Sequence, residues 1–270
     1  PYTTLFRSWT QPWHKNWRSF LVAMDKFNEH LSAKGIVFAC SMYNIQHTVT
    51  PVNGKLQVKL ECERPDVEIR YTMDGKEPTD RSLLYKSPLM VTGTQTIKCT
   101  TYRAGRQMGK TLTLPLVWNK ATAKPVLGNT QAGKILVNGI RGSLRQSDFE
   151  WHSWESSDSV AFTIDLQKKE SLRSVSVGCI TNYGMAAHKP ADIEVWVSND
   201  NRDYRKVSGK QFTDGEIFRE GTFKEDVVLD LNKEIGRYVR IIAKGAGECP
   251  ATHVRPGQEA RIYFDEVMIE

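Results

Sequence analysis

The sequence has no long apolar run, few cysteines and no C-x-x-C pair. No window approaches the ~18 consecutive apolar residues of a membrane span, so we expect no membrane-spanning helix. The five cysteines are far apart, and no cysteine/histidine cluster has zinc spacing, which argues against a metal knot. We expect buried thiols, although Cys62 and Cys99 lie in candidate strands of one domain and could pair in an oxidising compartment.

The largest part of the chain carries no net positive charge. The net charge is 37 − 31 = +6, yet residues 125–270 carry 19 Lys/Arg against 22 Asp/Glu. A nucleic-acid-binding domain would gather Lys and Arg on one module, so we expect no nucleic-acid partner. The length of 270 residues favours two domains with an extra fragment. No leader with a charged start and an apolar centre opens the chain.

The first forty residues differ from the rest. Residues 1–8 resemble the translation of a sequencing-library adapter, so we expect them to be an artefact outside the fold. Residues 17–34 place apolar side chains at helical spacing, and Gly35 supplies a stop. We expect this stripe either to cover the middle domain or to remain exposed; it comprises Trp17, Phe20, Leu21, Met24, Phe27 and Leu31.

The rest of the chain alternates with a period of two, which predicts β-strands. Residues 45–120 indicate a small immunoglobulin- or fibronectin-like β-sandwich. Residues 126–270 indicate a larger jelly-roll sandwich, and the polar stretch 119–125 connects the two. We expect strands over 56–60, 67–71, 96–102, 160–166, 174–178, 193–197, 226–231, 238–242 and 260–264. We also expect Trp196 in the core and Asp74-Gly75 in a turn.

A motif in the middle domain gives the first family resemblance. The segment Ile69-Arg-Tyr-Thr-Met-Asp-Gly-Lys-Glu-Pro-Thr79 resembles the signature of the chitobiase/β-hexosaminidase C-terminal domain. The resemblance covers roughly residues 45–118. Physically the motif is a strand, a turn and a loop ended by proline, so we interpret Asp74 as a turn former.

The preceding residues, 9–44, resemble the last helical unit of a (β/α) barrel of glycoside hydrolase family 20. The residues that carry this are Ser8-Trp-Thr-Gln, the helix and Gly35-Ile-Val-Phe…Met42-Tyr43. The resemblance implies a secreted, periplasmic or cell-surface bacterial β-N-acetylhexosaminidase that acts on terminal N-acetylhexosamine. Its catalytic Asp-Glu pair would lie in a barrel upstream. We therefore assign no catalytic residue here. The adjacent pair Asp265-Glu266 follows a strand of the last sandwich, and we do not expect it to be a hydrolytic dyad.

Residues 126–270 resemble coagulation-factor type C (discoidin) domains and the family 32 carbohydrate-binding modules. The segments that match are 136–143, 159–166, 193–200, 237–241 and 264–269. The resemblance implies glycan binding and a possible structural calcium ion, which takes oxygen ligands. The matching positions are Asn138, Ser143 and Glu266. Asn138 stands where the family usually has aspartate, and Asn138-Gly139 is equally read as a simple turn.

Sugar recognition requires an aromatic face and polar hydrogen-bonding groups. The loop residues that offer them are Trp151, His152, Trp154, Asn182, Tyr183, His188, His253 and Arg255. We expect galactose-type or N-acetylhexosamine ligands, no catalytic cofactor, and the missing barrel as a partner. Residues 185–187 stand where the resembling modules often carry a loop aromatic.

Two other interpretations stay open. The chain could be a non-enzymatic adhesion or carbohydrate-binding protein of two sandwiches, or the middle domain could serve only to dock on a barrel. Residues 9–43 distinguish the adhesion protein from the accessory region of an enzyme, because an adhesion protein does not need a helix that closes a barrel.

Overall fold

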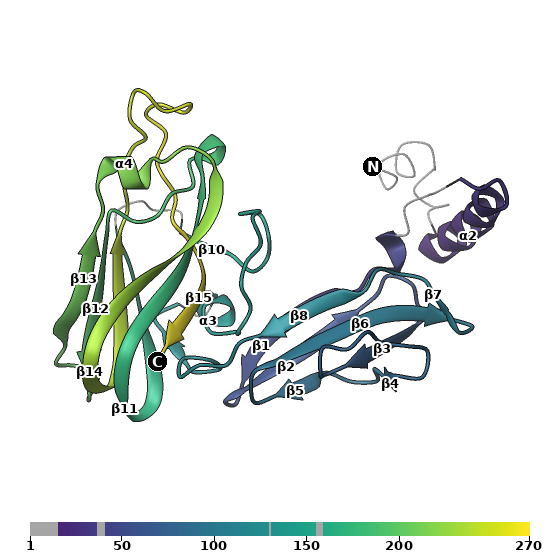
Figure 1. Ribbon diagram of the computed structural model, residues 1–270, viewed down its shortest axis with the longest axis horizontal. Helices are drawn as coiled ribbons and strands as arrows, with labels where there is room; N and C mark the ends of the chain where they lie inside the picture. Colours follow the sequence, from purple (N-terminus) through teal and green to yellow (C-terminus); the bar gives the residue numbers. More distant parts are fainter. Residues whose placement is uncertain (1–15, 37–40, 130, 155–158) are drawn as a thin grey trace.

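The computed structural model describes residues 16–36, 41–129, 131–154 and 159–270 (Figure 1). Residues 1–8 and Cys40 lie outside these ranges. The architecture is mainly β, as predicted, with a helix at the start, a small sandwich and a large sandwich. Among the described helices, none combines the length and apolar character that crossing a membrane requires.

The helix α2 (Trp17–Ala33) follows the expected bounds closely. Asn16 begins it by accepting a hydrogen bond from the Ser19 amide (3.1 Å). Gly35 ends it with φ +68°, a conformation that favours glycine. The helix crosses beyond one end of the small sandwich, near β7 (Figure 1). Leu21 is buried, whereas Trp17 and Phe27 are exposed, so the apolar stripe is covered only in part.

The small sandwich has two antiparallel sheets, and the turn η2 (Ser41–Tyr43) leads into it. One sheet has the order β1-β2-β5: β1 Gln46–Val52, β2 Lys55–Glu61 and β5 Leu89–Val91. The other has the order β4-β3-β6-β7, with β8 also paired to β6: β3 Glu68–Thr72, β4 Leu83–Leu84, β6 Gln95–Arg103, β7 Arg106–Gln107 and β8 Leu112–Leu116. Leu56, Val58 and Leu60 alternate into the core between the sheets. Asp74 forms the predicted turn by accepting a hydrogen bond from the Lys76 amide (3.2 Å).

The large sandwich is one sheet in the order β10-β15-β11-β14-β12-β13, with β9 on β11. Its elements are β9 Val126–Leu127, α3 Ala132–Ile135, β10 His152–Ser153, β11 Ser159–Asn182, η3 Tyr183–Met185, β12 Asp192–Ser198, β13 Arg205–Gln211, α4 Asp214–Ile217, β14 Thr222–Lys244 and β15 Tyr263–Ile269.

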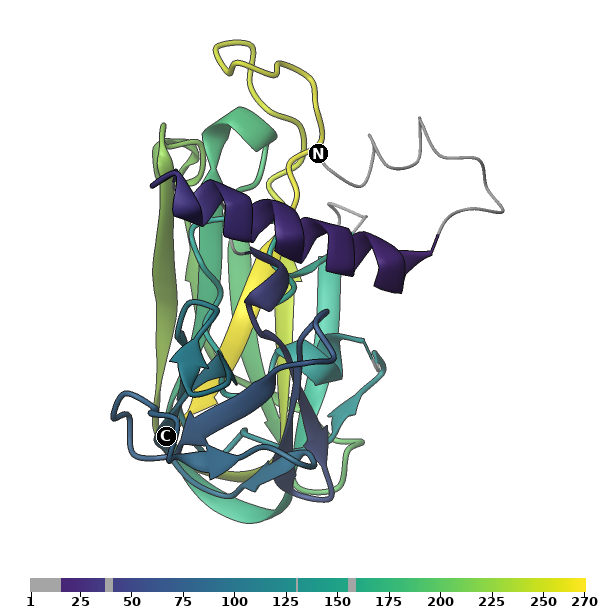
Figure 2. The same ribbon diagram turned by 90° about the vertical axis from the view of Figure 1, so that its right-hand side faces the viewer.

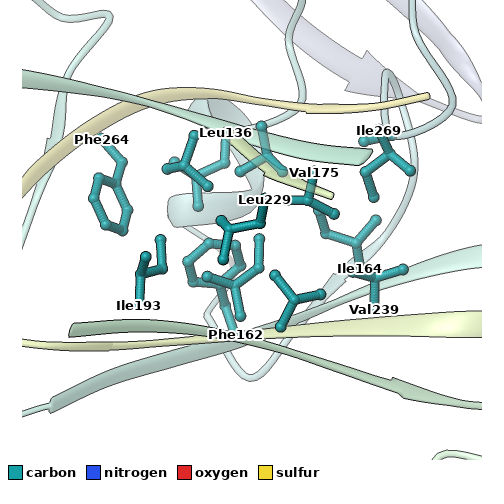
Figure 3. Packing of buried hydrophobic residues seen from close by; sticks show 14 of the residues in the cluster. Leu136, Phe162, Ile164, Val175, Ile193, Leu229, Val239, Phe264 and Ile269 are labelled. Carbon is teal, nitrogen blue, oxygen red and sulfur yellow. The ribbon is translucent and has the colours of Figure 1, made fainter. Parts of the chain in front are cut away.

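Two long strands turn this sheet into two layers. The residues of β11 before its bend pair with the end of β14, which pairs with β12 on its other side. The residues of β11 after the bend pair with the start of β14 and with β15. Register shifts at 165/170 and 172/174 mark the bend. The two layers face each other across an apolar core that includes Leu136, Phe162, Ile193 and Phe264 (Figure 3).

Two expectations for this sandwich were wrong. The last strand begins at Tyr263 rather than Ala260. Trp196 is half-buried on the outer face, where its Nε1 donates to Glu194 Oε2 (2.8 Å). Residues two apart along a strand share a face, so Trp196 lies on the same side as Glu194.

The connector between the sandwiches packs into both cores. Ala121 belongs to the core of the large sandwich and Ala123 to that of the small one, which Ile140, from the segment after α3, also joins. The Val117 amide donates to the Gly139 carbonyl (2.9 Å), which ties the end of the small sandwich to the start of the large one. The described cysteines, Cys62, Cys99, Cys179 and Cys249, are free thiols, so the Cys62–Cys99 pairing does not form.

Candidate functional site

Five of the predicted sugar-contact residues meet at one end of the large sandwich. We call Asn182, Tyr183, His188, His253 and Arg255 the end-loop cluster. They come from the end of β11, from the segment that follows it and from the loop of residues 245–261, which rises beside α4 (Figures 1 and 2). An isolated bridge between Ala187 and Arg261 and the core contact of Ala186 with Cys249 and Ala260 hold the two segments together.

The two histidines of the cluster are interior groups. Their exposed fractions are 1% for His188 and 4% for His253, and their Nε2 atoms lie 3.2 Å apart. Burial lowers the pKa of His188 to about 4 and also lowers that of His253. Both rings are therefore neutral at neutral pH and support the loops from beneath rather than present themselves to solvent.

The other three residues lie nearer the surface. Tyr183 packs on His253 with ring centroids 3.9 Å apart, and its hydroxyl donates to the Thr252 carbonyl (3.4 Å). Arg255 is exposed, and its Nε donates to the Gly184 carbonyl (2.6 Å). Asn182 donates through Nδ2 to Gln146 Oε1 (2.8 Å), which brings the loop before β10 alongside. An aromatic ring, a guanidinium and an amide thus lie together at one end of the large sandwich.

The other predicted sugar contacts pack elsewhere. Trp151 is buried against Gly142 and donates through Nε1 to the Ser143 carbonyl (3.0 Å). Trp154 contacts Phe264, with ring centroids 5.3 Å apart, and packs on the core. His152 makes an edge contact with Trp154, and burial lowers its pKa. The structure therefore places these three beside β15, inside their own packing contacts.

Two features near the cluster were missed by sequence reasoning. Phe149 lies in the loop that holds Gln146 and is 95% exposed. Its signal was an aromatic residue in an otherwise polar segment. A groove of about 450 Å³ also opens beside the start of the 245–261 loop. It is lined by Ser159, Asp192, Glu194, Ile242, Lys244, Gly245 and Gly247.

The calcium candidates differ in their surroundings. Glu266 is fully buried, its Oε2 accepts from the Gly139 amide (3.0 Å), and its Oε1 has no hydrogen-bond partner among the described residues. Asn138 is also buried, and its Oδ1 accepts from the Ile140 amide (2.9 Å). Ser143 is exposed, and its Oγ accepts from the Arg145 amide (3.1 Å). A buried carboxylate oxygen without a donor fits a cation ligand at Glu266, whereas Ser143 has its own local bonds.

Asp265 is also fully buried. Its Oδ2 accepts hydrogen bonds from Arg141 Nε and from the Gly142 amide, both at 2.9 Å. The Asp265-Glu266 pair is therefore enclosed in the sandwich and hydrogen-bonded to residues 139–142.

Comparison with known proteins gives a class to each sandwich. Residues 50–113 match the sequence model of the Chitobiase/beta-hexosaminidase C-terminal domain. Residues 120–255, just over half of the chain, match that of the F5/8 type C domain. The chain belongs to the F5/8 type C domain family.

Solved structures resemble parts of the chain at low similarity. CpGH89CBM32-6 produced by Clostridium perfringens is 18% identical, with 54% of this chain and 90% of that chain covered and a TM-score of 0.32. CpGH89CBM32-5 from the same organism, in complex with GalNAc-β-1,3-galactose, is 14% identical, with 54% and 91% covered and a TM-score of 0.34. The C-terminal domain of a chitobiase from Bacteroides fragilis is 12% identical, with 48% and 76% covered and a TM-score of 0.30. No curated protein matches the chain in sequence.

Proposed function

We propose that the large sandwich binds glycans, weakly, on the surface of the end-loop cluster. The observation that carries this is the meeting of Asn182, Tyr183 and Arg255 at one end of an F5/8 type C domain. Tyr183 offers a ring to the apolar face of a pyranose, and the amide and guanidinium offer hydrogen bonds to hydroxyls. His188 and His253 position Tyr183 from below.

We expect the binding surface to be shallow, which sets the expected affinity. A shallow site removes little apolar area from water, so we expect dissociation constants from about millimolar to high micromolar, or roughly 4–6 kcal/mol. The ligands are glycans that end in galactose or N-acetylhexosamine. Weak binding still serves an enzyme that is tethered to its substrate, because tethering raises the effective concentration.

We also propose that the chain is the accessory region of a family 20 β-N-acetylhexosaminidase that a bacterium exports to its surface, periplasm or medium. The match of residues 50–113 to the chitobiase/β-hexosaminidase domain supports this. The exposed apolar side chains of Trp17 and Phe27 on α2 are compatible with packing against a preceding barrel. In this proposal residues 9–44 close the barrel, the two sandwiches bind and support, and catalysis lies upstream. The competing function is an adhesion protein with no enzyme.

The test is a titration of the 270-residue chain, followed by NMR, with oligosaccharides that end in galactose, N-acetylgalactosamine or N-acetylglucosamine. We expect the amides of residues 182–187 and 252–258 to shift. Tyr183→Ala and Arg255→Ala should weaken binding at least about tenfold, the effect of losing roughly 1.4 kcal/mol. The matched control Tyr204→Ala changes a half-buried tyrosine in the segment between β12 and β13 and should leave binding unchanged.

Three outcomes would count against this site. If no resonance moves at tens of millimolar sugar, the large sandwich is a structural spacer. If the shifts centre on Asp192 and Glu194, the sugar occupies the groove on the outer face instead. If binding survives both variants, glycan binding stands and the assigned residues are wrong.

A further inference from the structure

Three side chains that commonly bind metals meet beneath the end-loop surface. The ligand atoms of His188, Cys249 and His253 all lie within 4.8 Å of one another. Cys249 is 3% exposed, so it is an interior group like the two histidines. His188 comes from the segment between η3 and β12, and the other two come from the 245–261 loop. The cluster thus bridges two segments that are distant in sequence.

The spacing of the nitrogen atoms suits a tetrahedral metal. Zinc–nitrogen bonds of about 2.0–2.1 Å at tetrahedral angles separate two ligand nitrogens by roughly 3.3 Å. The Nε2 atoms of His188 and His253 are 3.2 Å apart. A thiolate with two imidazoles is a donor set that favours zinc and similar ions over hard cations such as calcium.

The hydrogen bond of His188 already prepares it as a ligand. Its Nδ1 lies 3.0 Å from the Ile217 carbonyl, and because a carbonyl only accepts, Nδ1 carries the proton. The Nε2 lone pair is then directed at the cluster. Metal-binding histidines are usually oriented by such a bond from the other ring nitrogen.

Without a metal, His253 carries its proton on Nε2, the opposite ring nitrogen from His188. Its Nδ1 accepts from the Arg255 amide (3.0 Å), so its Nε2 carries the proton and donates it to His188. A metal would replace that proton. His253 would then carry its proton on Nδ1 and lose the bond from Arg255, a small cost beside the energy of a zinc site.

We propose that His188 Nε2, Cys249 Sγ and His253 Nε2 bind one zinc ion, with a water molecule as the fourth ligand. The Cys249 thiol releases one proton to solvent on binding, and His253 only shifts its proton between its two ring nitrogens. Two aromatic rings pack against the histidines. The Tyr183 ring centroid lies 3.9 Å from that of His253, and the Phe218 ring makes an edge contact with His188 at 5.0 Å between centroids. The ion would fasten the 245–261 loop to the segment that carries Tyr183.

Zinc binding at these three residues does not require glycan binding. The zinc site is defined by its own ligands and is tested with the metal alone. If sugar moves no resonance while zinc binds, the glycan proposal falls and the metal site stands. If zinc does not bind while sugar does, the reverse holds.

The experiment uses the full chain after dialysis against a chelator, with Zn²⁺ by calorimetry and Co²⁺ by absorption. We expect one equivalent of Zn²⁺ and a thiolate-to-cobalt charge-transfer band. Cys249→Ser keeps nearly the same shape and should remove the band and weaken Zn²⁺ at least tenfold. Cys62→Ser, which changes a half-buried free thiol of the small sandwich, should change neither.

A second variant tests whether a loss of zinc binding is caused by misfolding. His188→Gln should keep the NMR spectrum of the small sandwich and lose tight Zn²⁺ binding. Titrations in buffers of different ionisation enthalpy should show one proton released per zinc. The proposal is overturned if Zn²⁺ fails to bind at micromolar concentrations. It is also overturned if folded Cys249→Ser retains the charge-transfer band, since the cobalt would then have another thiolate ligand.

Discussion

Arg64 of the small sandwich donates from Nη2 to Oδ2 of Asp25 on α2. The Arg64 side chain is 3% exposed, and its Nη1 also donates to the Leu21 carbonyl of the same helix (3.1 Å). Asp25 in turn accepts from the Tyr43 hydroxyl (2.6 Å). A buried guanidinium therefore fixes the helix to the end of the sandwich, where the apolar contact of α2 is incomplete.

Removing this guanidinium should loosen the helix. Arg64→Met leaves a similar apolar volume but deprives Asp25 of one cation and Leu21 of a donor. We expect a loss of on the order of 2 kcal/mol in the free energy of unfolding, because an incompletely paired, partly buried carboxylate is costly. Urea unfolding followed by tryptophan fluorescence measures it. The exposed Arg106→Met should lose less than about 0.5 kcal/mol. Equal losses in both variants would mean that the network does not hold the helix.

Acid should act on the same network. Hydrogen bonds from Arg64 and Arg103 hold the pKa of Asp66 at about 2, and the pKa of Asp25 is lowered because bonds from Tyr43 and both arginines outweigh its burial. Since the folded-state pKa values lie below the unfolded ones, these groups stabilise the fold above pH 4 and lose that effect as pH falls towards 2. The unfolding free energy should fall across this range, and less steeply in Arg64→Met. Parallel curves for the two proteins would contradict this.

Gly139 should be indispensable at the junction of the sandwiches. Its φ is +76°, and a Cβ there would lie 2.8 Å from the Val117 carbonyl oxygen. Gly139→Ala should therefore destabilise the chain by at least about 2 kcal/mol more than Gly128→Ala does. Gly128 has φ +88° but open space around it, so it reports the backbone cost alone. Thermal unfolding compares the two, and equal shifts would mean that the junction yields easily.

The sequence was most informative where a pattern repeats along one element. Leu56, Val58 and Leu60 alternate between apolar and polar neighbours, and the strand follows their period. The apolar run at Ala260 misled, because residues 259 and 261 form isolated bridges to the end loops instead of joining the sheet ladder. Trp196 misled because its size suggested the core, whereas its register with Glu194 decided its face.

The candidate site was harder to predict from the sequence than the strands, because its residues come from separate segments. Asn182, Tyr183 and Arg255 were identified as loop residues that can hydrogen-bond or stack. Nothing in the sequence shows that His188 lies against His253, since the chain path between them runs through β12, β13 and β14. Spacing along the chain argued against a zinc site, because His188, which lies close to Cys249 and His253, comes from a distant segment. Burial of Trp151 depends on Gly142 beneath its ring, a contact that only the fold supplies.

Calcium should act through Glu266. Burial raises the pKa of this carboxyl well above its usual value, and Oε1 accepts no well-aligned hydrogen bond from the described residues. We propose that Glu266, Asn138 and backbone carbonyls bind calcium, without Ser143, whose side chain is exposed and bonded locally. Calcium should then raise the melting temperature of the wild-type chain, and chelation should lower it. Glu266→Gln should abolish the response, whereas Glu248→Gln, an exposed control, should retain it. An equal calcium response in both variants would remove Glu266 from the ligand set.

The chain should not hydrolyse aryl N-acetylglucosaminides. A general acid must lie within about 2.6–3.2 Å of the leaving oxygen, and the adjacent carboxyls of Asp265 and Glu266 are both fully buried. Asp265 is also committed to Arg141 and to the Gly142 amide. A colorimetric assay at millimolar substrate should show no turnover above buffer. Turnover that disappears in Asp265→Asn or Glu266→Gln would show that substrate reaches these carboxyls. Turnover that survives both substitutions would place a catalytic group elsewhere in the chain, and the proposed division between a catalytic barrel and non-catalytic sandwiches would be wrong.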